Sequence, residues 1–245
     1  SDVPDPVTAA RAMRQHWMLG TVPINHLVYE LEQHGILTVF FSMKEDLALD
    51  EKSRIDAFST TALPRPMIVL TPDKANDVMR HRFSAAHELG HIVLHHGRQG
   101  TDSQLERQAD MFAAEFLTPR DAIRDQLPRR INFNRYEELS QLLGVSINSL
   151  IFRSRELDLI SESTARRAYI TLNGIARRPM PVHDYPGERP ELLKSALELL
   201  DQAGVPLTQV AEDLQMTPRH IRRLAGIDDP QPKLTLVKDH PDNRK

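Results

Sequence analysis

Apolar residues recur along the chain with two different spacings. Residues 5–17 and 24–35 place them three and four positions apart, which predicts two amphipathic helices. Three short apolar runs follow, at 36–41, 55–60 and 65–70, and each is typical of a β-strand. Because these runs are short and close together in the chain, we expect them to form one small sheet.

Two longer helices are predicted after the sheet. Thr71 can cap the first one and Pro72 suits its first turn, so we expect this helix to continue to about Gly97. The second longer helix is predicted over residues 105–117, where apolar positions again have helical spacing.

The remainder of the chain has a purely helical pattern. Residues 136–160, with Gly144 at the turn, and residues 191–226 each show two helices separated by a short turn, which is the arrangement of a helix-turn-helix unit. A segment rich in proline and glycine, 174–190, lies between them and is typical of a linker. The predicted fold class is therefore α+β: a small β-sheet with its helices, followed by all-helical, helix-turn-helix-like domains.

Composition limits the classes of function. The 245 residues carry a formal net charge of -3, so nucleic-acid binding would need a local basic face. Without cysteine, the chain must hold any metal ion through imidazole and carboxylate groups. No apolar run approaches the roughly 20 residues of a membrane span and no signal peptide opens the chain, so we expect a cytoplasmic protein with no membrane partner. The start at Ser1, without methionine, suggests that natural sequence is missing upstream.

The segment RFSAAHELGHIVLHHG, residues 82–97, contains four of the eleven histidines. His87 and His91 are four residues apart, so on a helix both imidazoles leave the same face and can bind one metal ion. Glu88 lies at the rim of that site, where H-E-x-x-H zinc peptidases have their general base. The alternative is a helix with chance histidines, but the flanking residues are apolar or small, and burying these polar groups without a partner is costly.

A catalytic zinc ion usually has three protein ligands and an open fourth position. The pattern H-E-x-x-H-x-x-G-x-x-H is excluded, because Leu94 and Gly97 stand where it needs glycine and histidine. His95 lies one turn after His91, but three ligands on one straight helix splay too far apart to surround an ion. We therefore expect His95 to position a ligand or to face the substrate.

The better candidates for a third ligand lie on the following helix. Glu106 and Asp110 are four residues apart on one face, so that Glu106 can bind the ion and Asp110 can accept the N–H of a liganding histidine. Glu115 points to the opposite face and is kept as an alternative ligand. In an ordinary amphipathic helix all three acids would face water instead. Spacing does not identify a donor for the oxyanion, for which His95 and Tyr136 are the candidates.

The two segments AAHELGHIVLHH and ERQADMFAAEFLTP together resemble the ImmA/IrrE family of zinc metallopeptidases. In that family H-E-x-x-H is followed by E-x-x-A-N/D-x-F-A-x-x-L-L-x-P, and Phe116 replaces the first leucine of this pattern here. The resemblance covers roughly residues 5–175 and implies zincin-like active-site helices. It also implies a Zn²⁺ cofactor whose ligands are His87, His91 and Glu106. The glutamate that activates water in the family corresponds to Glu88.

Members of that family cleave helix-turn-helix transcriptional repressors. The resemblance therefore implies a zinc-dependent endopeptidase whose substrate is a repressor protein and whose action derepresses genes of a stress response, a phage or a mobile element. Many members carry a repressor-type DNA-binding domain ahead of the peptidase, and a chain that starts at Ser1 would fit its removal. The alternative is a non-enzymatic transcriptional regulator that binds DNA and uses the peptidase fold as a sensor or interaction module.

Contact with DNA, if the chain makes it, is predicted in the second helix-turn-helix unit. Arg219, Arg222 and Arg223 lie at i, i+3 and i+4, so they share one helix face that can contact phosphates. The first unit offers only Arg153 and Arg155 on its second helix, so we expect that unit to be a scaffold. An exposed basic helix face is also common in proteins that do not bind DNA.

These interpretations divide the chain into five parts. They are a zinc metallopeptidase domain at 1–121, a helix-turn-helix-like domain at 122–178, a linker at 179–190, a second helix-turn-helix-like unit at 191–230, and a tail at 231–245.

Overall fold

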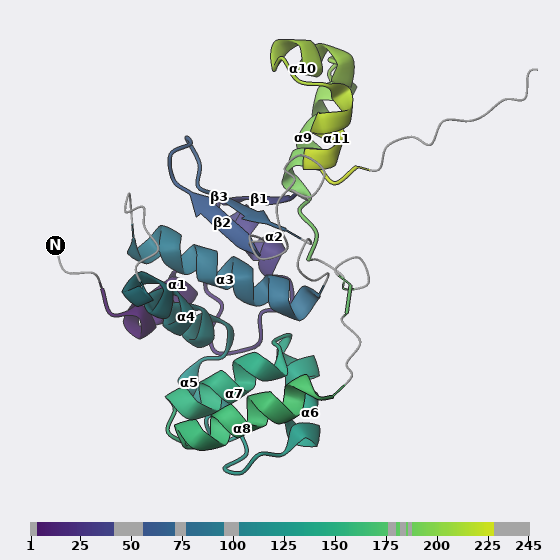
Figure 1. Cartoon of the computed structure of the whole chain (residues 1–245). Helices are drawn as coiled ribbons and strands as arrows, with labels where there is room; N and C mark the ends of the chain where they lie inside the picture. The colour runs from purple at the N-terminus through teal and green to yellow at the C-terminus, as the bar shows by residue number, and fades with distance from the viewer. Residues whose placement is uncertain are drawn as a thin grey trace, which may run out of the picture.

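The computed structural model describes residues 4–41, 56–71, 77–95, 103–175, 180–181, 185 and 188–227. Helices and one three-stranded sheet make up the described part of the chain, which confirms the predicted α+β class (Figure 1). None of the described helices combines the length and the apolar character needed to cross a bilayer. The predicted tail and half of the predicted linker lie outside the described residues.

The sheet contains three short strands, in the spatial order β1 (Leu37–Phe40), β3 (Met67–Leu70) and β2 (Ala57–Thr60). β1 runs parallel to β3, with Val39 opposite Val69. β2 runs antiparallel to β3, with Ser59 opposite Ile68. Each strand falls inside one of the predicted runs, so the three strands and their common sheet are confirmed.

Four helices lie in the same part of the chain as this sheet, and α2 and α3 make its main helix contacts: α1 (Pro6–His16), α2 (Leu27–Gln33), α3 (Val78–Leu94) and α4 (Ser103–Leu117). α3 lies between β2 and β3 on one side and α4 on the other, and α1 packs mainly against α4 (Figure 1). The side chain of Asp5 caps α1, and Pro6 occupies its first turn. α3 is therefore the central helix of this part, held from the sheet side and from the helical side.

The start of α3 differs from the prediction. Its N-cap is Asp77, whose side chain accepts a backbone N–H of the first turn at 3.0 Å, so the expected cap at Thr71 is wrong. The N–H of Thr71 instead bonds to the carbonyl of Asp56 at 2.9 Å, which extends the pairing of β2 with β3. α3 ends at Leu94, earlier than predicted, with His95 as its C-cap residue.

A helical part follows α4 and contains α5 (Arg120–Ile123), α6 (Phe133–Leu143), α7 (Ile147–Glu156) and α8 (Glu162–Asn173). Gly144 ends α6 with a φ of 64°, a left-handed conformation that favours glycine at the predicted turn. Leu139 and Leu150 of this part belong to the same buried cluster as Leu89 of α3 and Phe112 of α4. The hydrophobic core therefore continues across residue 121, where we predicted a domain boundary.

The C-terminal part contains α9 (Leu192–Gln202), α10 (Leu207–Asp213) and α11 (Pro218–Leu224). It lies beyond the sheet, at the opposite end of the molecule from α5–α8 (Figure 1). Its buried hydrophobic residues among those described are Ala211, Ile221 and Ala225. Glu32 of α2 accepts the backbone N–H of Leu192 at 3.2 Å and so caps the start of α9. The C-terminal part thus has a small core of its own and is tied to the rest of the chain at α2.

Candidate metal centre

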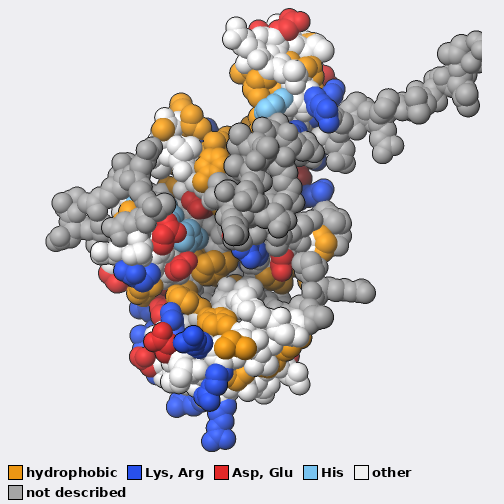
Figure 2. Space-filling view, in the orientation of Figure 1, with side chains coloured by type: hydrophobic (Ala, Val, Ile, Leu, Met, Phe, Trp, Pro, Cys, Tyr) orange, Lys and Arg blue, Asp and Glu red, His pale blue; other side chains and the backbone are white. Residues whose placement is uncertain are grey.

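α3 carries the H-E-x-x-H segment across the middle of the molecule. His87 and His91 lie one turn apart and keep 16% and 20% of their side-chain surface exposed, so both are accessible from one face. Figure 2 shows histidine and acidic side chains close together on the central part of that face. Glu88, between the two histidines in sequence, is buried.

α4 brings two acidic residues to the same place because it packs closely against α3. Gly90 permits this approach: a Cβ at that position would lie 3.2 Å from both the Cα of Ala109 and the Cδ1 of Phe112. The helices are then near enough for Glu106 and Asp110, one turn apart on α4, to reach the histidines of α3. The glycine inside the H-E-x-x-H motif therefore sets the helix spacing on which the site depends.

Three side chains converge at this point. The Nε2 atoms of His87 and His91 are 3.0 Å apart. Glu106 lies between them, with Oε2 at 3.2 Å from His87 Nε2 and Oε1 at 3.4 Å from His91 Nε2. Within the described part of the chain, this is the one group of three or more histidine and acidic side chains whose ligand atoms come so close together.

These separations suit a tetrahedral metal ion. Two ligand atoms that are each roughly 2.0–2.1 Å from a tetrahedral centre lie about 3.3–3.4 Å from one another. The three separations here are 3.0, 3.2 and 3.4 Å, so a shift of a few tenths of an ångström would seat the ion. Two imidazoles and one carboxylate are also a donor set typical of catalytic zinc.

Each histidine has a hydrogen-bond partner on its second ring nitrogen. Asp110 Oδ1 is 2.9 Å from Nδ1 of His87, which is the contact predicted for Asp110. Nδ1 of His91 is 3.0 Å from Nδ1 of His95. With Asp110 accepting from Nδ1–H, the lone pair on Nε2 of His87 points into the cluster.

Glu88 is held by the sheet. Its Oε2 accepts the hydroxyl of Ser59 on β2 at 2.6 Å. Burial raises the pKa of Glu88, and the hydrogen bond from Ser59 and the charge of His87 offset this only in part. A carboxyl group with a raised pKa exchanges protons closer to neutral pH, as a general base or acid must.

The two histidines of the motif differ in proton affinity. Burial acts to lower the pKa of His87, but the hydrogen bond to Asp110 and the nearby carboxylates outweigh it and raise the pKa. Burial, followed by the charge of His87, lowers the pKa of His91 to about 4. At neutral pH His91 is therefore neutral and has a lone pair that can bind a metal ion. His87 holds its proton more tightly and releases it when a metal ion binds.

The sequence pattern of the IrrE N-terminal-like domain, which defines peptidase family M78, matches residues 31–155. The chain belongs to the ImmA/IrrE family of metallopeptidases. The matched residues begin in α2 and end in α7, so they include the sheet, α3, α4 and α6. No curated protein matches the chain. The resemblance noted in the sequence is thus confirmed at the level of the family.

Three residues weighed from the sequence are not at the positions that a third ligand or a substrate-facing group would need. Glu115, the alternative ligand, is 1% exposed and is paired with Arg153 and with Arg11, so it is not part of the cluster. Tyr136 is fully buried and its hydroxyl bonds to Ser154, which removes it as an oxyanion donor. His95 is 3% exposed and is enclosed between α3 and α4, which argues against its expected place on the substrate side and as an oxyanion donor.

Sequence reasoning missed two residues that touch the site. Ser59 was one polar position among others in a predicted strand, and only the packing of β2 on α3 brings it to Glu88. Gln108 lies between Glu106 and Asp110 in sequence, and its Oε1 is 3.0 Å from Nε2 of His95. Neither residue carries a local signal, because each acts across the space between two elements.

The basic face predicted on α11 is partly engaged within the chain. The guanidinium of Arg223 lies 4.6 Å from the centre of the Phe41 ring, just beyond β1, which is the geometry of a cation–π contact. The His220 ring lies 5.9 Å from the same phenyl ring. Arg223 is therefore turned towards the peptidase sheet.

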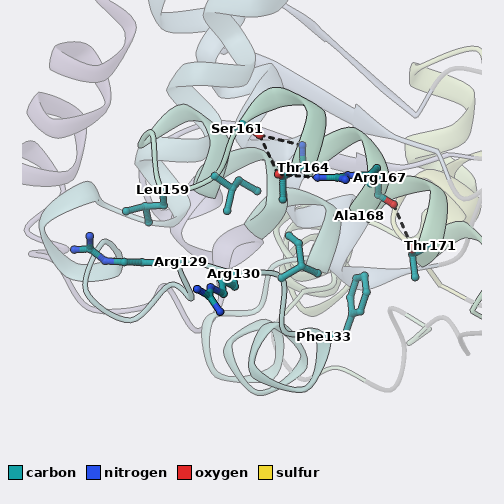
Figure 3. A pocket seen from close by; sticks show the side chains of 11 residues that line it. Arg129, Arg130, Phe133, Leu159, Ser161, Thr164, Arg167, Ala168 and Thr171 are labelled. Carbon is teal, nitrogen blue, oxygen red and sulfur yellow. Dashed lines mark hydrogen bonds between the residues drawn. The ribbon is translucent and has the colours of Figure 1, made fainter.

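A cavity that is separate from this cluster lies in the helical part of the metallopeptidase. It has a volume of about 440 Å³, and Figure 3 shows it bordered by Arg129, Arg130, Phe133, Thr164 and other residues of α6, α8 and the adjoining loops. Its described lining includes no histidine or carboxylate and no residue of α3 or α4. The groups suited to metal-dependent hydrolysis thus lie on α3 and α4 and outside this cavity.

Proposed function

We propose that the chain is a zinc-dependent endopeptidase that hydrolyses a peptide bond in a helix-turn-helix transcriptional repressor and thereby derepresses the genes that the repressor controls. The observation that carries the catalytic part is the convergence of His87, His91 and Glu106 to within 3.4 Å of one another, beside the buried Glu88. The repressor substrate rests on the resemblance to the ImmA/IrrE family, and such a substrate would place the reaction in the cytoplasm.

In this proposal His87, His91 and Glu106 hold the zinc ion, which when bound polarises the scissile carbonyl and makes a water molecule acidic. Glu88 takes the proton of the attacking water on its carboxylate and returns it to the leaving nitrogen. Ser59 keeps Glu88 in place through its hydrogen bond to Oε2, and the proton goes to the other carboxylate oxygen. Asp110 fixes the proton of His87 on Nδ1, so that Nε2 stays free to bind the metal.

The sheet offers a place for the substrate chain. β2 pairs with β3 along one edge, and its other edge has no strand partner among the described residues. An extended peptide can add to such an edge through main-chain hydrogen bonds. Because Ser59 of β2 contacts Glu88, a peptide aligned there lies beside the general base.

The decisive experiment compares Glu88→Gln with the unchanged chain. Protein purified without chelator should contain about one zinc per chain by elemental analysis in both cases. A purified helix-turn-helix repressor encoded next to this gene should be cut by the unchanged chain and left intact by Glu88→Gln, with fragments identified by mass spectrometry. Glu162→Gln, an exposed acid on α8, serves as the matched control and should cut normally.

Two outcomes would contradict the proposal. Cleavage by Glu88→Gln at a near-normal rate would remove the proton-transfer role of Glu88. Failure of Glu106→Ala to reduce the zinc content would remove Glu106 from the ligand set. The non-enzymatic regulator gains no comparable observation, since Arg223 already lies over Phe41, and DNA binding through α11 stays a prediction.

A further inference from the structure

We infer that His95 is a positioning residue for the metal site, which holds His91 in the one tautomer that can bind zinc and is itself held by Gln108. The inference rests on the proposed function, because it concerns how a proposed ligand is prepared. It adds to that function a second hydrogen-bonded support, different in kind from the carboxylate of Asp110.

The three side chains form a continuous line from the cluster through the buried His95 to Gln108 on α4. Nδ1 of His91 is 3.0 Å from Nδ1 of His95, and Nε2 of His95 is 3.0 Å from Oε1 of Gln108. His95 is 3% exposed and sits at the C-cap of α3, with its backbone N–H bonded to the carbonyl of His91. Gln108 comes from α4, so the line spans both helices of the site.

The positions of the protons along this line follow from its far end. The carbonyl oxygen of Gln108 can only accept, so the ring proton of His95 must be on Nε2. Nδ1 of His95 then has a lone pair, and it can accept only if His91 carries its proton on Nδ1. That tautomer leaves the lone pair of His91 on Nε2, the atom that faces His87 and Glu106. The opposite arrangement would put a proton on the metal-binding nitrogen.

The supports of the two histidines differ in charge. His87 donates to a carboxylate, Asp110, whereas His91 donates to a neutral imidazole. A carboxylate partner makes a ligand more basic, and a neutral partner fixes its orientation without adding negative charge. The carboxylates of Glu106 and Asp110 already offset much of the charge of a bound Zn²⁺ ion. A neutral partner at His91 adds no further negative charge, so the ion keeps positive charge for activating water.

The test measures zinc affinity of the whole chain by competition with a chelator. His95→Leu removes the acceptor and should weaken zinc binding about 10–100-fold, the range for lost outer partners. His95→Asn keeps an acceptor oxygen near the Nδ1 position and should recover most of this loss. Gln108→Leu should weaken binding by a smaller factor, and Gln108→Glu, which keeps an acceptor, should bind zinc nearly as well as the unchanged chain.

Thermal unfolding of the metal-free proteins separates this role from simple packing, because Gln108→Leu and Gln108→Glu should unfold close to the unchanged chain. If His95→Leu does not fold, the two Gln108 variants carry the test. In the zinc-loaded protein, ring nitrogen NMR shifts should place the proton of His91 on Nδ1 and that of His95 on Nε2. Unchanged zinc affinity in the Leu variants, or His95→Asn as weak as His95→Leu, would overturn the inference while zinc binding itself still stood. An unchanged chain without zinc affinity would instead refute the proposed function.

Discussion

The charge pair between α4 and α7 gives the sharpest test of how the two parts of this molecule hold together. Glu115 is 1% exposed, and so is its partner Arg153. The same carboxylate accepts Arg11 Nε at 2.8 Å and the backbone N–H of Arg120 at 3.2 and 3.3 Å. Both carboxylate oxygens of Glu115 are thus engaged inside the protein. Glu106 lies nine residues earlier on the same helix.

Glu115→Gln keeps the size of the side chain and removes its charge. Breaking a buried ion pair from one side costs about 3–5 kcal/mol, because the remaining charge is left without its partner. Arg153 retains Glu156 at 2.5 Å and the carbonyl of Thr118 at 3.0 Å, so we expect the lower end, about 3 kcal/mol. With a urea dependence of about 3 kcal/mol per M, the unfolding midpoint should fall by about 1 M.

The assay is urea unfolding followed by circular dichroism, in metal-free buffer so that zinc does not add stability. Glu106→Gln is the matched control: it is the same change on the same helix, at a side chain that is 49% exposed. Its unfolding free energy should stay within about 0.5 kcal/mol of the unchanged chain, as for surface substitutions.

Zinc binding should rank the two variants in the opposite order from unfolding stability. Folded Glu115→Gln should still hold about one zinc per chain, and Glu106→Gln should bind it far more weakly. If Glu115→Gln unfolded at the normal midpoint, the reasoning from the buried pair would be wrong. If it also lost zinc while folded, the assignment of Glu106 as the ligand would need revision.

Two further outcomes are expected. Gly90→Ala should weaken zinc binding about tenfold in chelator competition, because the added methyl group must move α4 away from α3. The higher helix propensity of alanine, worth about 1 kcal/mol, limits the loss of folding stability. Zinc affinity equal to that of the unchanged chain would contradict the spacing argument. Duplex-DNA binding by the whole chain is measured by fluorescence anisotropy, and we expect none that depends on the basic face of α11, since Arg223 lies over Phe41. The comparison is the variant in which Arg219, Arg222 and Arg223 are all changed to Glu. Binding with a log–log salt slope of about -2.7 that disappears in this variant would favour the regulator.

The sheet and the histidine motif were predictable because their signals are local. Each strand is a short apolar run, and the pair His87 and His91 needs only the pitch of one helix. The third ligand depends on how two helices pack. Spacing proposed Glu106 and left Glu115 open, and burial of Glu115 with Arg153 is what separates them. No pattern within α4 alone distinguishes a carboxylate that meets a metal site from one that meets an arginine.

The start of α3 shows a different limit. Thr71 and Pro72 form a good local start signal, yet Asp77 is the cap. Thr71 instead continues the pairing of β2 with β3, so the end of the sheet takes the residue that the local signal assigned to a helix start. Ser59 and Gln108 could not be found for a related reason: their partners are 29 and 13 residues away in the chain.

Buried arginines explain why the helical part belongs with the metallopeptidase. Arginine is rarely buried unless it is paired, so a sequence pattern assigns it to the surface. Here Arg82, five residues before His87, is 1% exposed, donates to the carbonyl of Gly144 at 2.7 Å and is paired with Glu188.

Arg153 of α7 is equally buried against α4. One arginine therefore points from α3 into the turn between α6 and α7, and the other points from α7 back to α4. Arg153, one of the two arginines on α7, is thus used inside the protein, where it cannot contact a DNA phosphate. This favours α6–α8 as a scaffold that fixes α3 and α4 at the distance that the proposed metal site requires.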